Sequence, residues 1–129
     1  MKNRTIVSVF MLALVGVCAL SSASACETKD GKPKQSQRFE QLNNNKVHTW
    51  RSVIVVDQPL KLHRHDYPRV VTALRDGTLK RTLVSGEVLS VHHWQAGESY
   101  WLDADPENEL HYCVNAGNEP LEVVVTEIK

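Results

Sequence analysis

Two observations predict an all-β fold for this chain. Short apolar runs rich in Val, Leu and Ile recur from about residue 50 to the end, in lengths typical of strands, and no stretch has a convincing helical period. Turn-forming clusters of Gly, Pro, Asn and Asp separate these runs about every ten to twenty residues. Many short strands at such a spacing indicate an antiparallel sandwich or barrel.

Each strand is expected from its apolar run and from the turn that ends it. The β-branched run Val53–Val56 is closed by Asp57-Gln58-Pro59, since Pro cannot donate a ladder hydrogen bond. Asp76-Gly77 is a strong hairpin signal. Alternation and turn positions together predict strands over residues 53–56, 60–65, 69–74, 78–84, 87–94, 99–102, 109–114 and 121–128.

The N-terminal residues have the pattern of a secretory signal peptide. Lys2 and Arg4 precede an apolar run that begins at Ile6, and small residues at Ala23 and Ala25 form an A-x-A cleavage site. The apolar run is about fifteen residues long, short of the ~20 that a membrane-spanning helix needs. Residues 1–25 are therefore expected to be removed, and the protein to be exported to a bacterial periplasm or cell envelope.

Cys26 follows the cleavage site, and two interpretations of it stay open. Ala23-Ser24-Ala25-Cys26 is similar to a bacterial lipobox, with Ala where Leu is usual, so Cys26 is a candidate for lipidation. Ordinary cleavage before Cys26 fits equally well. Since Cys18 leaves with the signal, only Cys26 and Cys113 remain, too few for a disulfide framework. A lipid at Cys26 would be the one membrane attachment.

Charge and length limit the remaining function classes. The chain of 129 residues has a formal net charge of zero, and loss of Lys2 and Arg4 leaves about −2. No basic patch is present, which excludes nucleic acid as an expected partner. About 104 residues remain after cleavage, enough for one domain. Residues 26–46 are polar and predicted to be a flexible arm or tether, and residues 47–129 the folded barrel.

Three histidines are the main functional signal. His63 and His65 flank one residue, so in a strand they share a face, and His111 follows about fifty residues later. If its strand lies alongside, three imidazoles can converge on one point. Such a set is a common ligand shell for Zn, Fe, Ni, Cu or Mn.

These residues resemble the two motifs of the cupin family. In the first motif, His63, His65 and Gly77 match, Asp57 stands at the first Gly, and Val70 or Arg69 falls where the family has Glu. In the second, Pro106, His111 and Asn115 match, and Asn108 replaces the inner Gly, a position that suits a residue tolerant of φ > 0.

The resemblance covers roughly residues 53–128 and implies a cupin-type antiparallel β-barrel, jelly-roll-like, preceded by the polar arm. It implies a divalent metal (Zn, Fe, Mn or Ni) held by His63, His65 and His111. It also implies a small-molecule ligand, an anionic one among the alternatives, and a homodimer. Fold does not fix function, so the reaction stays open. An enzyme would be a metal-dependent dioxygenase or isomerase; the alternative is a non-enzymatic ligand-binding or envelope-associated cupin without metal.

Four further residues are candidates for the pocket or for additional ligation. Glu109 and Cys113 alternate with His111 and share its face, although a free Cys is more often a buried core residue. Arg69 would hold an anionic ligand or pair with Glu109 if it points inward, and is a surface residue if it points outward. His93 forms a pair with His92, of which one side chain should face inward.

Overall fold

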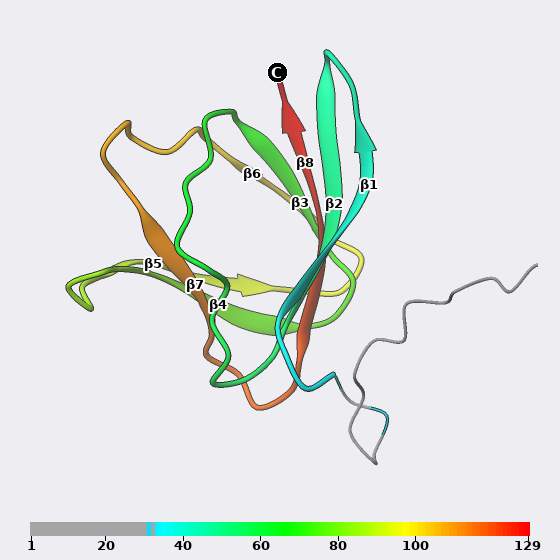
Figure 1. Ribbon diagram of the computed structural model, residues 1–129. Helices are drawn as coiled ribbons and strands as arrows, with labels where there is room; N and C mark the ends of the chain where they lie inside the picture. Colours follow the sequence, from blue (N-terminus) through cyan, green and yellow to red (C-terminus); the bar gives the residue numbers. More distant parts are fainter. Residues whose placement is uncertain (1–30, 32) are drawn as a thin grey trace, which may run out of the picture.

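The computed structural model describes Gly31 and residues 33–129, and these form two antiparallel sheets (Figure 1). The predicted signal peptide and Cys26 lie outside the described residues. No helix in the described part of the chain is long and apolar enough to span a membrane. The strands are β1 (Gln37–Asn43), β2 (Val47–Ile54), β3 (Arg69–Ala73), β4 (Gly77–Leu83), β5 (Val88–Trp94), β6 (Ser99–Leu102), β7 (His111–Asn115) and β8 (Leu121–Ile128).

The two sheets enclose a core and a cavity between them. The larger sheet has the order β1-β2-β8-β3-β6 and the smaller one β5-β4-β7. Side chains alternate across each strand, so every second residue of β2, β8 and β3 faces the interior. The buried apolar residues come from both sheets: Trp50, Ile54, Val71, Ala73, Leu79, Trp94, Cys113, Leu121, Val123 and Val125. The prediction of an antiparallel all-β barrel is confirmed.

The folded domain begins earlier than predicted, because it includes strand β1. Residues 26–46 were expected to form a flexible arm, but β1 pairs with β2 from Gln37↔Val53 to Asn43↔His48. The prediction was wrong for Gln37–Asn43, because backbone pairing and one-sided packing stabilise a strand that is mostly polar. The turn that follows is fixed by Asn44, whose side-chain oxygen accepts the backbone N–H groups of Lys46 and Val47 at 2.8 and 2.9 Å.

The hairpin expected at Asp76-Gly77 is absent: β3 pairs with β6 and β8, and β4 pairs with β5 and β7. The chain instead crosses from one sheet to the other here. Gly77 is needed for close packing rather than for a turn, since an added Cβ would lie 2.7 Å from Cδ1 of Leu121. The positive φ expected at Asn108 is also not found; it occurs at Asp57, with φ of 60°, where the cupin motif has its first Gly.

The connection between β2 and β3 replaces the strand expected over residues 60–65. It runs beside β7, as the green segment next to the orange strand in Figure 1. The backbone N–H of Leu60 donates to the carbonyl of Cys113 at 3.0 Å, and His63 exchanges two hydrogen bonds with His111. Two residues separate Leu60 from His63 but only one separates Cys113 from His111, so the pairing is irregular and no regular strand forms.

Candidate functional site

The backbone pairing between the β2–β3 connection and β7 brings the three predicted histidines together. His63 N donates to His111 O at 3.1 Å, and His111 N donates to His63 O at 2.9 Å. The ring centroid of His63 lies 4.7 Å from that of His111 and 5.0 Å from that of His65. One ligand nitrogen from each ring lies within 4.8 Å of the others. The predicted cluster is therefore present as a group of side chains.

Two of the rings are anchored through Nδ1. The Nδ1 of His63 lies 2.6 Å from the carbonyl oxygen of Lys61, and the Nδ1 of His65 lies 2.6 Å from Oε1 of Glu127. Both acceptors favour the tautomer with the proton on Nδ1, which leaves the lone pair on Nε2. Hydrogen bonds of this kind orient histidine ligands in metal sites.

The third ring, His111, is fully buried, and its Nε2 has no hydrogen-bond partner among the described residues. A buried nitrogen without a partner is costly, so it marks a place where an additional group fits. Burial, followed by the positive charge of Arg81, lowers the pKa of His111 to about 3. Burial also lowers the pKa of His63. Both imidazoles are neutral at pH 7, the form that ligates metals.

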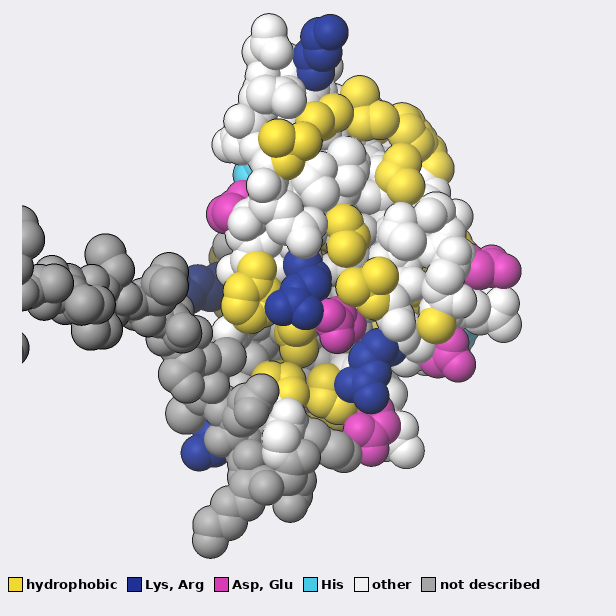
Figure 2. All heavy atoms as spheres, turned by 90° about the vertical axis from the view of Figure 1, so that its right-hand side faces the viewer, with side chains coloured by type: hydrophobic (Ala, Val, Ile, Leu, Met, Phe, Trp, Pro, Cys, Tyr) yellow, Lys and Arg dark blue, Asp and Glu magenta, His cyan; other side chains and the backbone are white. Residues whose placement is uncertain are grey.

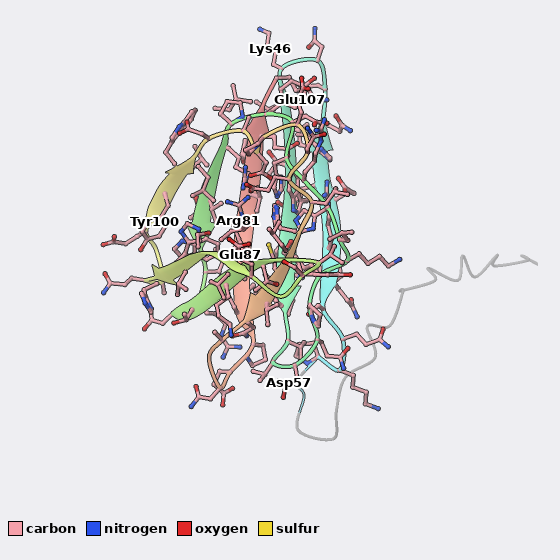
Figure 3. The ribbon with its side chains drawn as sticks, turned by 90° about the vertical axis from the view of Figure 1, so that its left-hand side faces the viewer. Lys46, Asp57, Arg81, Glu87, Tyr100 and Glu107 are labelled. Carbon is pink, nitrogen blue, oxygen red and sulfur yellow. The ribbon has the colours of Figure 1, made fainter. Side chains whose placement is uncertain are left out.

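A second cluster surrounds Arg81 and shares His111 with the first. The Nη2 atom of Arg81 lies 2.6 Å from Oδ1 of Asp105, 2.9 Å from Oε1 of Glu109 and 3.3 Å from Nδ1 of His111. Asp105, Glu109 and His111 have ligand atoms within 4.8 Å of one another, as a metal site would. In this second cluster the cation is the guanidinium group of Arg81, which takes the place that a metal ion would have. Figure 3 shows Arg81 in the middle of the barrel, whereas Lys46 and Asp57 lie at its ends.

Arg69 points into the barrel and is only 3% exposed. It donates to the carbonyl of Asp103 at 2.9 Å and lies 3.4 Å from Oδ1 of Asp105. The alternative in which Arg69 pairs with Glu109 was wrong, since Glu109 pairs with Arg81. Burial would raise the pKa of Asp105, but the backbone N–H of His65 and the charges of Arg69 and Arg81 lower it. Asp105 is therefore an anion shared by two arginines.

A cavity of about 490 Å³ lies beside both clusters, lined at its polar end by His63, His65, Arg69, Arg81 and Cys113. The Cys113 thiol lies 3.9 Å from Nε2 of His63 but belongs to neither ligand group. Burial raises its pKa to about 11, so it is a neutral thiol at pH 7. Cys113 is a buried core residue that borders the cavity.

The assignment of His93 to the pocket was wrong. His93 is exposed on β5 and its Nδ1 lies 3.0 Å from the hydroxyl of Thr78. Its neighbour His92 is the half-buried one, and burial, with Arg81 and Arg69 nearby, lowers its pKa. The alternation of the pair was expected, but its direction depends on the register of β5 with β4, which the sequence does not reveal.

Sequence analysis missed Arg81, Asp105 and Glu127. A signal for Arg81 does exist, because it lies two residues from Leu79 and so shares the inward face of β4. The ladder between β4 and β5 shifts register directly after Arg81, an irregularity that redirects side chains. Asp105 and Glu127 carry no such signal, since each is an acidic residue in a polar turn or near a strand end.

Comparison with known proteins identifies the fold. No protein-family model matches the sequence, and no curated protein does either. Among solved structures, the chain is similar to a cupin domain from Bordetella pertussis Tohama I (TM-score 0.62, 21% identity, covering 74% of this chain and 94% of that one).

It is also similar to an RmlC-like cupin family protein with a double-stranded β-helix fold from Methanocaldococcus jannaschii (TM-score 0.55, 14% identity, 84% and 92% covered). A protein with a double-stranded β-helix domain from Klebsiella pneumoniae has a TM-score of 0.53 at 20% identity, with 74% and 77% covered. These similarities establish a cupin fold, as the sequence motifs predicted.

Proposed function

We propose that this small cupin domain binds one divalent metal ion through Nε2 of His63, His65 and His111. The observation that carries the proposal is Nε2 of His111, a buried nitrogen without a hydrogen-bond partner beside two imidazoles. The Nδ1 contacts of His63 and His65 favour the tautomer that ligation requires. Zn, Fe, Mn and Ni all accept three imidazole nitrogens.

A metal held by three imidazoles would supply a Lewis-acid centre with open positions for water or ligand. The residues of the chain have the supporting roles. Glu127 orients His65, and Asp105 lies 3.6 Å from Nδ1 of His111. The adjacent cavity of about 490 Å³ would hold a small molecule within reach of these side chains.

Elemental analysis of the purified protein, prepared without a histidine tag, tests this proposal. We expect about one divalent metal ion per chain, and its loss from His63→Ala. The matched control is His93→Ala, because His93 is an exposed histidine on β5. Equal metal content in the wild-type protein and in His63→Ala would contradict the three-histidine site.

The alternative is a ligand-binding cupin without metal, and one observation favours it. The guanidinium group of Arg81 lies 3.3 Å from Nδ1 of His111, and a like charge disfavours a bound cation. Metal-free protein from every preparation, together with retained ligand binding, is the expected outcome of this alternative.

We further propose that the protein is exported to the cell envelope, on the basis of residues 1–25, and that Cys26 is lipidated. Cell fractionation tests both. We expect the wild-type protein with the membranes and Cys26→Ala in the soluble envelope fraction. Detection of the protein in the cytoplasm with its first 25 residues intact would contradict export.

A further inference from the structure

The cavity has one apolar part and one cationic part. Its apolar lining comes from both sheets and consists of Trp50, Ile54, Leu60, Val71, Leu79, Trp94, Leu102, Val123 and Val125. At ~30 Å³ per water molecule, 490 Å³ is the volume of about 16 waters, which leaves room for a ligand of about a dozen non-hydrogen atoms. Apolar walls of this extent favour a ligand with a hydrocarbon body.

The charged groups that line the cavity are all basic. They are Arg38, Lys61, Arg69 and Arg81, beside His63 and His65, and no carboxylate lines it among the described residues. Asp105 and Glu109 contact Arg81 without lining the cavity. A ligand in the cavity therefore meets the guanidinium groups in preference to the carboxylates.

Arg69 is the least neutralised of the buried charges. Its one carboxylate contact is Oδ1 of Asp105, at 3.4 Å, and the same oxygen lies 2.6 Å from Arg81. Arg81 has a second carboxylate, Glu109, at 2.9 Å, which Arg69 lacks. The other partner of Arg69, the carbonyl of Asp103 at 2.9 Å, carries no net charge, so a further anion at hydrogen-bond distance would stabilise this buried cation.

The entrance adds long-range attraction for the same charge. Arg38 lies over the ring of Trp50, 3.7 Å from its centroid, but its Nε is paired with Glu40 at 2.7 Å, so the attraction comes from Lys61, which is exposed at the edge of the cavity. On the face seen in Figure 2, Lys and Arg side chains lie among hydrophobic ones and beside Asp and Glu side chains. Basic groups around an opening raise the local concentration of anions.

We propose that the ligand is an apolar organic monocarboxylate, with its carboxylate at Arg69 and its hydrocarbon body among the side chains of the two sheets. This inference rests on the ligand cavity of the proposed function but does not require a metal. One carboxylate would balance the charge of Arg69, whose carboxylate contact is long and shared, whereas Arg81 has two carboxylates within 2.9 Å although its Nε has no hydrogen-bond partner among the described residues.

Isothermal titration calorimetry with three probes tests the inference: octanoate, 1-octanol and acetate. Each is titrated into the full chain after removal of metal by chelation, and again after loading with zinc. We expect octanoate to bind at least tenfold more tightly than 1-octanol, which lacks the charge, and than acetate, which lacks the hydrocarbon body. Equal or tighter binding of 1-octanol, equal binding of acetate, or no binding of octanoate would overturn the inference.

Arg69→Gln is the decisive variant. We expect it to lose at least tenfold in affinity for octanoate and to keep its affinity for 1-octanol. Arg69→Lys, which retains the charge, should restore part of the preference. The matched control is Arg75→Gln, an exposed arginine outside this cavity. An unchanged octanoate affinity in folded Arg69→Gln would refute the assignment. Because octanoate is measured on metal-free protein, failure of the metal site leaves this result intact, and the reverse also holds.

Discussion

The two clusters that share His111 have the same kind of ligand geometry but different cations. Asp105 and Glu109 both pair with the guanidinium group of Arg81, and Nδ1 of His111 lies 3.3 Å from Arg81 and 3.6 Å from the carboxylate of Asp105. On the other side of the same ring, Nε2 lies beside the imidazoles of His63 and His65 with no hydrogen-bond partner within the described residues. The difference indicates that the chain supplies one cation itself and leaves the second position for a group from outside.

The largest expected effect on stability comes from removing Arg81, the cation of the second cluster. Arg81→Met leaves the buried carboxylate of Asp105 with the long contact to Arg69 as its one arginine contact, beside the backbone N–H of His65. Breaking a buried ion pair typically costs about 3–5 kcal/mol, so we expect a loss of that size in the free energy of unfolding, measured with urea.

The control is Arg75→Met at an exposed position, which should change the stability by less than ~0.5 kcal/mol. Excess zinc should restore stability to Arg81→Met, because the emptied group of Asp105, Glu109 and His111 has metal-ligand spacing. An Arg81→Met protein as stable as the wild type would show that the guanidinium is not needed there.

Acid provides a second test, which acts through His111, the residue that the two clusters share. The pKa of His111 is about 3 in the folded protein and about 6.5 in the unfolded chain. The unfolded state therefore binds the extra proton first, and stability is lost as pH falls below 6.5. At ~1.4 kcal/mol per pH unit, up to about 2 kcal/mol should be lost by pH 5, with a further loss from His63. Thermal melts of the metal-free protein that do not change between pH 7 and pH 5 would contradict this.

Glu127 allows the three-histidine cluster to be tested by itself, because this residue contacts His65 and has no contact with the Arg81 cluster. Glu127→Gln weakens the acceptor that holds Nδ1 of His65, so metal affinity should fall about 10- to 100-fold. The matched control is Glu122→Gln on the same strand, where the carboxylate pairs with Arg51. Competition with a chromophoric chelator measures both affinities. Equal losses in the two variants would mean that the effect comes from β8 as a whole.

Cys113 should have the smallest effect. Its thiol borders the cavity but lies in neither cluster, so Cys113→Ala should change metal affinity less than about threefold. The loss of a small buried side chain should cost about 1 kcal/mol of stability. A fall in cobalt affinity together with the disappearance of a thiolate-to-cobalt absorption band would instead make Cys113 a ligand.

The sequence predicted the fold and the three histidines because both follow from local patterns. Alternation and turn residues locate most strands to within a few residues, and β6 and β8 match their expected ranges. The convergence of His63, His65 and His111 was predicted from a motif and is present in the structure. Asn115, which matched the second motif, stabilises the turn after β7: its side chain donates to the carbonyl of Glu119 and accepts the N–H of Gly117.

The parts that sequence analysis missed depend on contacts between distant segments. The cation of the second cluster comes from Arg81, while its anions come from Asp105 and Glu109 in another connection. Strand β1 is polar and becomes a strand because β2 offers a free edge. The Asp76-Gly77 turn joins two sheets rather than two paired strands, which no local signal distinguishes from a hairpin.

The position of β8 also affects how the protein can fold. This strand follows β1 to β7 in the chain, yet it lies between β2 and β3, so the larger sheet has no centre until residues 121–128 have been made. Pairings between such distant segments form slowly, since the loop between them must close first. A nascent chain therefore cannot complete this sheet before residues 121–128 have been made, and this suits a protein that is proposed to cross a membrane before it folds.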